Sequence, residues 1–154
     1  MLEINNKTNH KVRVGQLKLI TEGFFRVYKK PGATVSLAIV GSKRMRRLNR
    51  EYRGIDKSTD VLSFPALSSW KKDPERYLGE IIINQEEAGK VKKYEEMLGE
   101  LDILAFRSGP EVRNYLFNFL FVHGLLHLVG YSDQTAAGRR EMLRRGRDFL
   151  KKML

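Results

Sequence analysis

The longest apolar stretch of this 154-residue sequence covers residues 115–129. Asn118, His123 and His127 interrupt it, and it is shorter than the ~18 to 20 apolar residues that a membrane-spanning helix needs. We therefore expect a helix over about 111–129 that is buried in the core of a folded domain rather than in a bilayer. The remaining segments must then supply the elements that cover it.

Turn-forming residues divide the rest of the chain into short strands and longer helices. Short apolar or alternating runs predict extended segments at 2–6, 11–14, 33–40, 59–64 and 77–84. Apolar residues at helical spacing predict further helices at about 15–29, 43–52, 85–98 and 135–153. Ser42 is expected to cap the helix that follows it, and Asn84 is expected to start another. Three consecutive isoleucines in the last strand predict that both of its faces are covered.

The order of these elements predicts the α+β class. We expect a small mixed four-stranded sheet and about five to six helices, arranged as a single layer of helices around the core helix. The sequence contains no internal repeat, low-complexity segment or linker, so residues 1–154 are expected to form a single domain.

Composition restricts both the chemistry and the partners. The chain has no cysteine, so a metal site must be built from His and carboxylate side chains. Lys and Arg number 29 against 18 Asp and Glu, which gives a formal charge of +11 and suggests a polyanionic partner such as RNA, DNA or anionic lipid. The first residues do not resemble a signal peptide, so we expect a cytoplasmic protein without a membrane partner.

Two histidines of the core helix carry a possible metal site. His123 and His127 are four residues apart, so both imidazoles lie on one face of a helix and can bind one cation. Gly130 can end the helix in a left-handed turn that brings Asp133 back to this face. Two imidazoles, one carboxylate and a fourth position for water are typical of catalytic zinc, so Zn²⁺ is the expected cofactor. The alternative is a pair of core histidines that bind no metal.

The residue after the first histidine weighs against one class of zinc enzyme. Peptidases with a His-Glu-x-x-His motif place their general base at this position, where this chain has Gly124. Zinc-dependent hydrolysis of a peptide is therefore disfavoured. Because glycine within a helix costs about 1 kcal/mol relative to alanine, we expect a substrate backbone, a neighbouring strand or another helix to approach closely at Gly124.

Three segments of the sequence, in this order, resemble the YbeY family of bacterial rRNA maturation factors. They are Leu48–Pro65 (LNREYRGIDKSTDVLSFP), Leu78–Ile83 (LGEIII) and His123–Tyr131 (HGLLHLVGY). The resemblance implies a single-strand-specific, metal-dependent endoribonuclease. It would act in 3′-end maturation of the small-subunit rRNA and in ribosome quality control. The implied partners are single-stranded RNA, small-subunit rRNA and the ribosome; the oligomeric state is not determined, although a monomer is favoured.

The resemblance also assigns roles to individual residues. Arg53 corresponds to an arginine that is important in the family, and a guanidinium there can hold a phosphate through two hydrogen bonds. A surface salt bridge is the alternative role for Arg53. The family usually has a histidine as third metal ligand where an ungapped alignment places Asp133; an alignment with a one-residue gap leaves that ligand missing. The segment from Tyr94 to Pro110 is longer than the family pattern, and we expect an extra turn or loop near the mouth of the cleft.

The basic residues suggest how RNA is bound, but they do not establish catalysis. They cluster at Lys43–Arg53, at Lys90, Lys92 and Lys93, and in the last helix at Arg139, Arg140, Arg144, Arg145, Arg147, Lys151 and Lys152. A groove that follows the phosphates is expected, and bases could stack on Tyr52, Phe64, Trp70 or Tyr131. The alternative function is a non-catalytic rRNA-binding ribosome-assembly factor with a structural metal.

Overall fold

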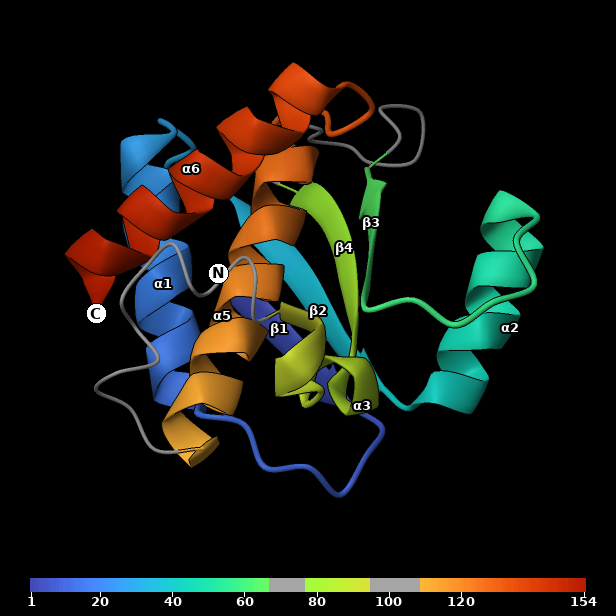
Figure 1. Ribbon diagram of the computed structural model, residues 1–154. Coiled ribbons are helices and arrows are strands. Elements are labelled where there is room, and N and C mark those ends of the chain that lie inside the picture. Colours follow the sequence, from blue (N-terminus) through green and yellow to red (C-terminus); the bar gives the residue numbers. More distant parts are fainter. Residues whose placement is uncertain (67–76, 95–108) are drawn as a thin grey trace.

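A four-stranded mixed sheet forms the centre of the molecule (Figure 1). The computed structural model describes residues 1–66, 77–94 and 109–154. The strands are β1 (Leu2–Asn6), β2 (Thr34–Val40), β3 (Val61–Pro65) and β4 (Tyr77–Asn84). Their order across the sheet is β1-β2-β4-β3; β2 is parallel to β1 and to β4, whereas β3 is antiparallel to β4. This arrangement confirms the predicted α+β class and the mixed four-stranded sheet.

Five α-helices occur in the described part of the chain. They are α1 (Val14–Val27), α2 (Ser42–Arg53), α3 (Gln85–Ala88), α5 (Gly109–Leu128) and α6 (Ala136–Met153). A 3₁₀ helix, η2, covers Val91–Tyr94. None of the helices in the described ranges is long and apolar enough to cross a membrane.

The apolar residues of β4 explain how the layers form. Ile81 and Ile83 point into the large core, to which α1, α5 and α6 contribute. Ile82 belongs to a smaller cluster on the other face, where Met45 of α2 is fully buried. The run of isoleucines is therefore covered on both faces, as predicted. α5, α1 and α6 form the helical layer on one face, and α2 covers part of the opposite face (Figure 1).

Gly124 allows α5 to lie close to β4. A Cβ atom added at this position would lie 2.7 Å from Cγ2 of Ile81, which is closer than real Cβ contacts. Ser63 of β3 also donates a hydrogen bond to the Gly124 carbonyl at 3.4 Å. The close approach expected at Gly124 is therefore that of a neighbouring strand, β4, which was one of the three possibilities suggested by the sequence.

Several predicted boundaries need correction. Residues 11–14 do not form a strand, because β1 pairs only with β2 and the chain then leaves the sheet to begin α1. The helix predicted at 85–98 ends at Ala88 and is followed by η2, since Gly89 terminates it; positions 95–98 lie outside the described residues. Gly41, not Ser42, is the N-cap of α2. Asn84 does cap α3, because its side chain accepts a hydrogen bond from Glu86 N–H.

Two further expectations fall outside the described residues. Trp70, one of the possible stacking residues, lies there, as does most of the long segment between Tyr94 and Pro110.

We expect the substitution Gly124→Ala to destabilise the protein by about 1–3 kcal/mol, because the added methyl group would force α5 away from Ile81. Urea unfolding followed by circular dichroism measures this difference. Gly15→Ala is the matched control, since Gly15 is also helical but has no atom within 4 Å of an added Cβ. An equal effect of both substitutions would contradict the close-packing argument.

Candidate metal centre and cleft

Three metal-ligating side chains meet at the C-terminal end of α5. One ligand atom from each of His123, His127 and Asp133 lies within 4.8 Å of the other two. Oδ2 of Asp133 is 3.3 Å from Nε2 of His123 and 3.5 Å from Nε2 of His127. The structure thus brings together the three residues that the sequence suggested as ligands.

The turn after α5 places Asp133. Gly130 has a φ of +105°, which favours glycine. Its N–H bonds to the carbonyl of His127, and the N–H of Tyr131 bonds to the carbonyl of Leu126. These two bonds form a Schellman motif, which reverses the chain and returns it to the face of the helix that carries the histidines. The left-handed turn predicted from Gly130 is therefore present.

Hydrogen bonding orients one of the imidazoles for metal binding. Nδ1 of His127 lies 3.1 Å from the carbonyl oxygen of Tyr131, so the Nδ1–H tautomer donates there. This leaves the lone pair of Nε2 directed at the cluster. Nδ1 of His123 is buried and has no hydrogen-bond partner among the described residues.

Burial and neighbouring charge set the protonation states. Burial lowers the pKa of His123 below its ordinary value, and the nearby His127 lowers it further. Burial acts to raise the pKa of Asp133, but His127 and His123 outweigh it and the pKa is lowered overall. At neutral pH, His123 is therefore a neutral imidazole and Asp133 is a carboxylate, the forms that bind a metal ion.

Two of the three separations in the cluster fit a small divalent ion. Ligand atoms about 2.0–2.1 Å from a tetrahedral zinc ion lie about 3.3 Å from one another. The two separations measured from Asp133 agree with this value. Asp133 retains 41% of its side-chain exposure and His127 27%, so the cluster faces solvent and leaves room for another ligand. This set of two nitrogen donors and one oxygen donor is the kind that catalytic zinc sites use.

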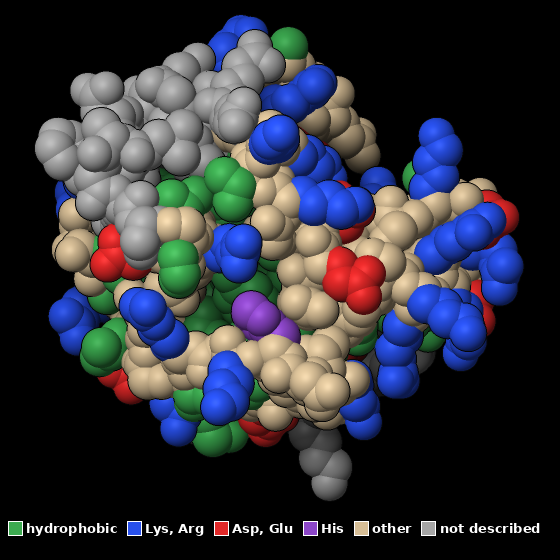
Figure 2. Space-filling view, turned by 60° about the horizontal axis from the view of Figure 1, so that its bottom comes forward, with side chains coloured by type: hydrophobic (Ala, Val, Ile, Leu, Met, Phe, Trp, Pro, Cys, Tyr) green, Lys and Arg blue, Asp and Glu red, His purple; other side chains and the backbone are tan. Residues whose placement is uncertain are grey.

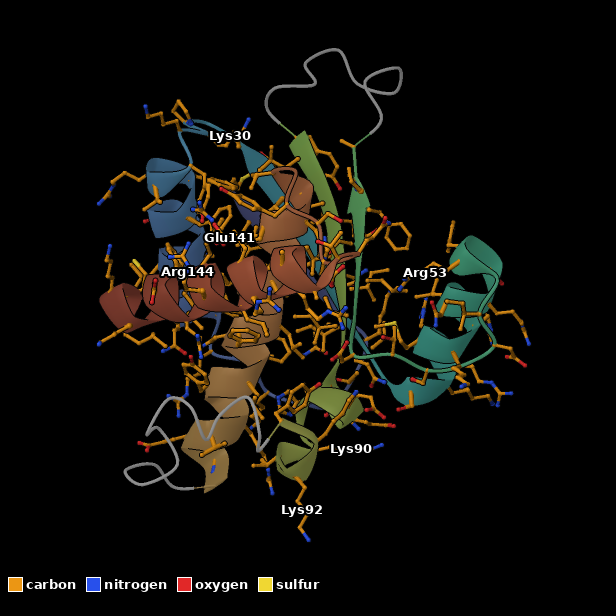
Figure 3. The ribbon with its side chains drawn as sticks, turned by 45° about the horizontal axis from the view of Figure 1, so that its top comes forward. Lys30, Arg53, Lys90, Lys92, Glu141 and Arg144 are labelled. Atoms are coloured by element: carbon orange, nitrogen blue, oxygen red, sulfur yellow. The ribbon has the colours of Figure 1, made fainter. Side chains whose placement is uncertain are left out.

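Arg53 lies in the same cleft as this cluster. The cleft has a volume of about 460 Å³, and the residues that line it include Arg53, Ser63, Phe64 and all three candidate ligands. Arg53 is the last residue of α2, and Figure 3 shows it on the side of α2 that faces β3. No ion pair of Arg53 occurs within the part of the chain that the structure describes. The salt-bridge alternative therefore has no support there.

Asp60 has a structural role in the wall of the cleft. Its Oδ1 accepts a hydrogen bond from Val61 N–H at 2.8 Å, and its Oδ2 accepts one from the hydroxyl of Tyr94 at 2.8 Å. Burial raises the pKa of Tyr94, and Asp60 raises it further. The link between Asp60 and Tyr94 depends on tertiary contact and has no sequence signal.

Part of the basic surface is neutralised by local ion pairs. Arg46 and Arg50 bond to Asp56, at 2.9 and 3.8 Å. Glu87 pairs with Lys90 and Lys93, and Glu141 pairs with Arg144 and Arg145. Figure 3 marks Lys90, Glu141 and Arg144 on their elements. Because exposed pairs contribute little to stability, their main effect is to reduce the positive charge available to a partner.

The fold and the cleft together define a class: a small α+β protein with a candidate metal centre between its core helix and an antiparallel strand. The model of the family Endoribonuclease YbeY matches residues 3–154. The chain belongs to this family.

Individual relatives agree with this assignment. Over 130 residues, or 84% of this chain, it is 33% identical to Endoribonuclease YbeY of Anaeromyxobacter sp., and the match spans 59% of that relative's length. It is 32% identical over 151 residues to Endoribonuclease YbeY of Acholeplasma laidlawii, covering 98% of this chain and 96% of that protein. The solution structure of TM1509 from Thermotoga maritima has the same fold, with a TM-score of 0.54 at 20% identity, covering 97% of this chain and 89% of that one.

In the metal-free protein, stability should fall as the pH drops below about 6.5, because the folded state resists protonation of His123 more than the unfolded state does. The slope contributed by this group is at most about 1.4 kcal/mol per pH unit. Urea unfolding between pH 7.5 and 5 measures it. His123→Gln should show a smaller dependence on pH in this window, and identical slopes for the two proteins would contradict the assigned protonation state.

Proposed function

We propose that this protein is a zinc-dependent endoribonuclease that cleaves single-stranded RNA in the cleft between α5, β3 and α2. The observation that carries the proposal is that Arg53 and the cluster of His123, His127 and Asp133 line one cleft. Family membership supports the choice of RNA as substrate. The formal charge of +11 agrees with a polyanionic substrate.

The candidate ligands would act as the metal-binding part of the site. His123 and His127 offer neutral nitrogen donors and Asp133 offers a carboxylate. A bound zinc ion supplies Lewis-acid polarisation of a phosphoryl oxygen and lowers the pKa of bound water. Asp133 contributes a negatively charged carboxylate where the family usually has a third, neutral histidine. We therefore expect the bound ion to be a weaker Lewis acid than in a site with three imidazoles.

Arg53 would orient the scissile phosphate. A guanidinium matches two phosphate oxygens and remains charged, so it can offset the negative charge that develops in phosphoryl transfer. Its position at the end of α2 brings this cation to the cleft from the side opposite α5.

A pair of aromatic rings beside Arg53 supports recognition of unpaired bases. Tyr52 and Phe64 have ring centroids 5.2 Å apart at an interplanar angle of 60°. Phe64 lines the cleft, and Tyr52 is 66% exposed. An exposed ring next to a phosphate-binding cation can stack on a base that is free of a duplex, which would favour single strands.

We further propose that the biological substrate is small-subunit rRNA on the ribosome, in the cytoplasm, where 3′-end maturation and quality control take place. The alternative is a ribosome-assembly factor that binds rRNA without cleaving it. Asp133 favours this second function, because it lies between α5 and α6 and a metal held there would tie the two helices together. The first test below distinguishes the two functions.

His127→Ala and Asp133→Ala should each abolish near-stoichiometric zinc binding and, with it, cleavage of a single-stranded RNA oligonucleotide. Elemental analysis and a cleavage assay on the same samples measure the two effects. Asp148→Ala is the matched carboxylate control, since Asp148 lies on exposed α6 away from the cleft. If the wild type binds zinc but cuts no more than a nuclease-free control, and zinc removal only lowers its Tm, the assembly-factor function replaces the nuclease.

Arg53→Ala should lower the cleavage rate by about 100-fold or more while zinc content stays unchanged, because the substitution removes transition-state charge stabilisation but no metal ligand. Arg53→Lys should recover only part of the rate, since an ammonium group cannot bind two phosphate oxygens in the same way. Arg26→Ala, an exposed substitution on α1, is the control for loss of charge. Cleavage at the wild-type rate by Arg53→Ala would reject the clamp role.

A further inference from the structure

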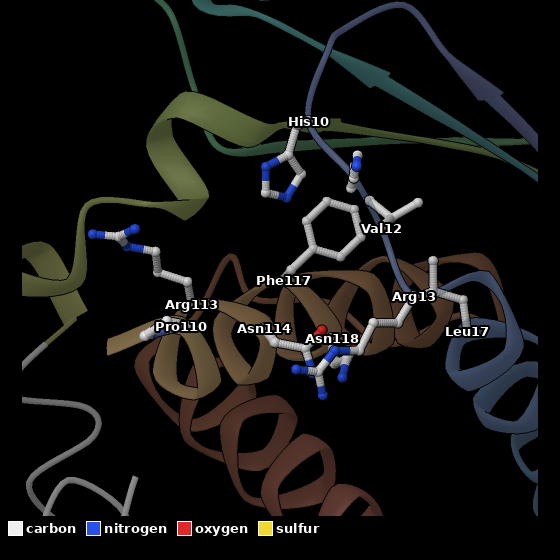
Figure 4. A pocket seen from close by; sticks show the side chains of 10 residues that line it. His10, Val12, Arg13, Leu17, Pro110, Arg113, Asn114, Phe117 and Asn118 are labelled. Carbon is white, nitrogen blue, oxygen red and sulfur yellow. The ribbon is translucent and has the colours of Figure 1, made fainter. Parts of the chain in front are cut away.

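A second pocket lies at the opposite end of α5 from the candidate metal centre (Figure 4). It has a volume of about 240 Å³ and lies between residues 10–13 and the first turns of α5. Figure 2 shows Lys and Arg side chains around a hollow in which hydrophobic side chains and a histidine are visible. Arg113 on its rim is fourteen positions from His127, which is about 21 Å along the helix axis. The two sites are therefore separate.

The charged residues of this pocket are all basic. Lys11, Arg13 and Arg113 line it, and among the residues that the structure describes no Asp or Glu does. Within the described ranges, neither arginine forms an ion pair, in contrast to the basic residues held by Asp56, Glu87 and Glu141. Arg13 is also the N-cap of α1 and makes no side-chain capping bond. A cation is unfavourable at this end of a helix, so a bound anion would relieve an existing electrostatic cost.

An aromatic pair forms one wall of the pocket. The rings of His10 and Phe117 have centroids 6.2 Å apart at an interplanar angle of 32°, and Figure 4 shows them facing each other. Phe117 is buried, whereas His10 is exposed and can present its free face to a planar ligand. Val12 and Leu17 add apolar surface nearby.

Local hydrogen bonds hold these groups in place before any ligand binds. The side-chain Oδ1 of Asn6 accepts bonds from the N–H and the hydroxyl of Thr8, and Nδ2 of Asn6 donates to the backbone carbonyl of His10 at 2.7 Å. On the other side, the side-chain Oε1 of Gln16 accepts bonds from Nδ2 of Asn114 and Nδ2 of Asn118 at 2.8 and 2.9 Å. A preorganised site loses less entropy when it binds a ligand.

We propose that this pocket binds one nucleotide of the single-stranded RNA at a position remote from the cleavage cleft. Arg13 and Arg113 hold its phosphate, and its base stacks on His10. The volume is below the 300–1,000 Å³ typical of pockets for drug-sized ligands, so it suits a single planar ring and not a larger ligand. A strand that occupies both sites must span several nucleotides. This inference rests on the proposed function only for the choice of RNA as ligand.

The test measures binding of a labelled 12-nucleotide oligouridylate to metal-free protein by fluorescence anisotropy, between 50 and 200 mM salt. Arg13→Ala/Arg113→Ala should weaken binding about tenfold or more, and should reduce the slope of log affinity against log salt by about 0.7, the contribution of one phosphate. His10→Ala should weaken binding about fivefold. Arg26→Ala/Lys29→Ala, at two exposed positions outside both pockets and outside the basic clusters, is the charge-matched control and should stay within about twofold of the wild type.

Circular dichroism melting of each variant checks that it is folded, and all of the substituted side chains are exposed. Equal binding by the pocket variant and the control would overturn the proposal, even if the wild type cleaves RNA. Conversely, if the wild type cleaves nothing but the pocket variant still loses affinity for the oligonucleotide, the pocket stands and the nuclease does not. Two competition experiments identify the ligand by displacing the labelled oligonucleotide with uridine monophosphate or with a polyglutamate peptide. If either competitor binds as tightly as the oligonucleotide, the occupant of the pocket is not an RNA strand.

Discussion

The close contact between α5 and β4 is the packing constraint on which the rest of the structure depends. Gly124 presents only a hydrogen atom to Ile81, so the most apolar helix of the chain can lie directly on the central part of the sheet. His123 and His127 are on the same helix, so this contact also sets their depth below the surface. β3 pairs with β4 and therefore forms the opposite wall of the cleft at a fixed separation.

Local patterns in the sequence predicted the parts of the fold that local physics determines. The buried helix, the isoleucine strand, the Asn84 cap and the turn at Gly130 all follow from side-chain type and spacing. The error at 11–14 arose where tertiary contacts decide whether a segment joins the sheet. The helix predicted at 85–98 was extended too far, because Gly89 ends α3. The spacing of residues 123–133 predicted that Asp133 returns to the two histidines. The position of Arg53 in the same cleft depends on contacts between distant segments, so only the family resemblance suggested it.

The ion pairs are distributed unevenly over the basic residues of the protein. Asp56, Glu87 and Glu141 each neutralise basic side chains on the surface of α2, η2 and α6. In the described part of the chain, the arginines of the cleft and of the second pocket have no such partners. Within the described ranges, these ion pairs thus neutralise basic side chains of the outer surface but not the arginines of the two concave places, although Asp60 and Asp133 also line the cleft. The total charge alone could not reveal this difference.

The Schellman turn at Gly130 has a consequence for the order in which the protein assembles. It brings three candidate ligands together within eleven consecutive residues, so the cost of closing that loop is small. Arg53 comes from a segment seventy residues earlier and reaches the cleft only when α2 and the sheet are in place. In a partly folded chain, the candidate ligand set can therefore form from local contacts alone, whereas the placement of Arg53 beside it requires the sheet and α2.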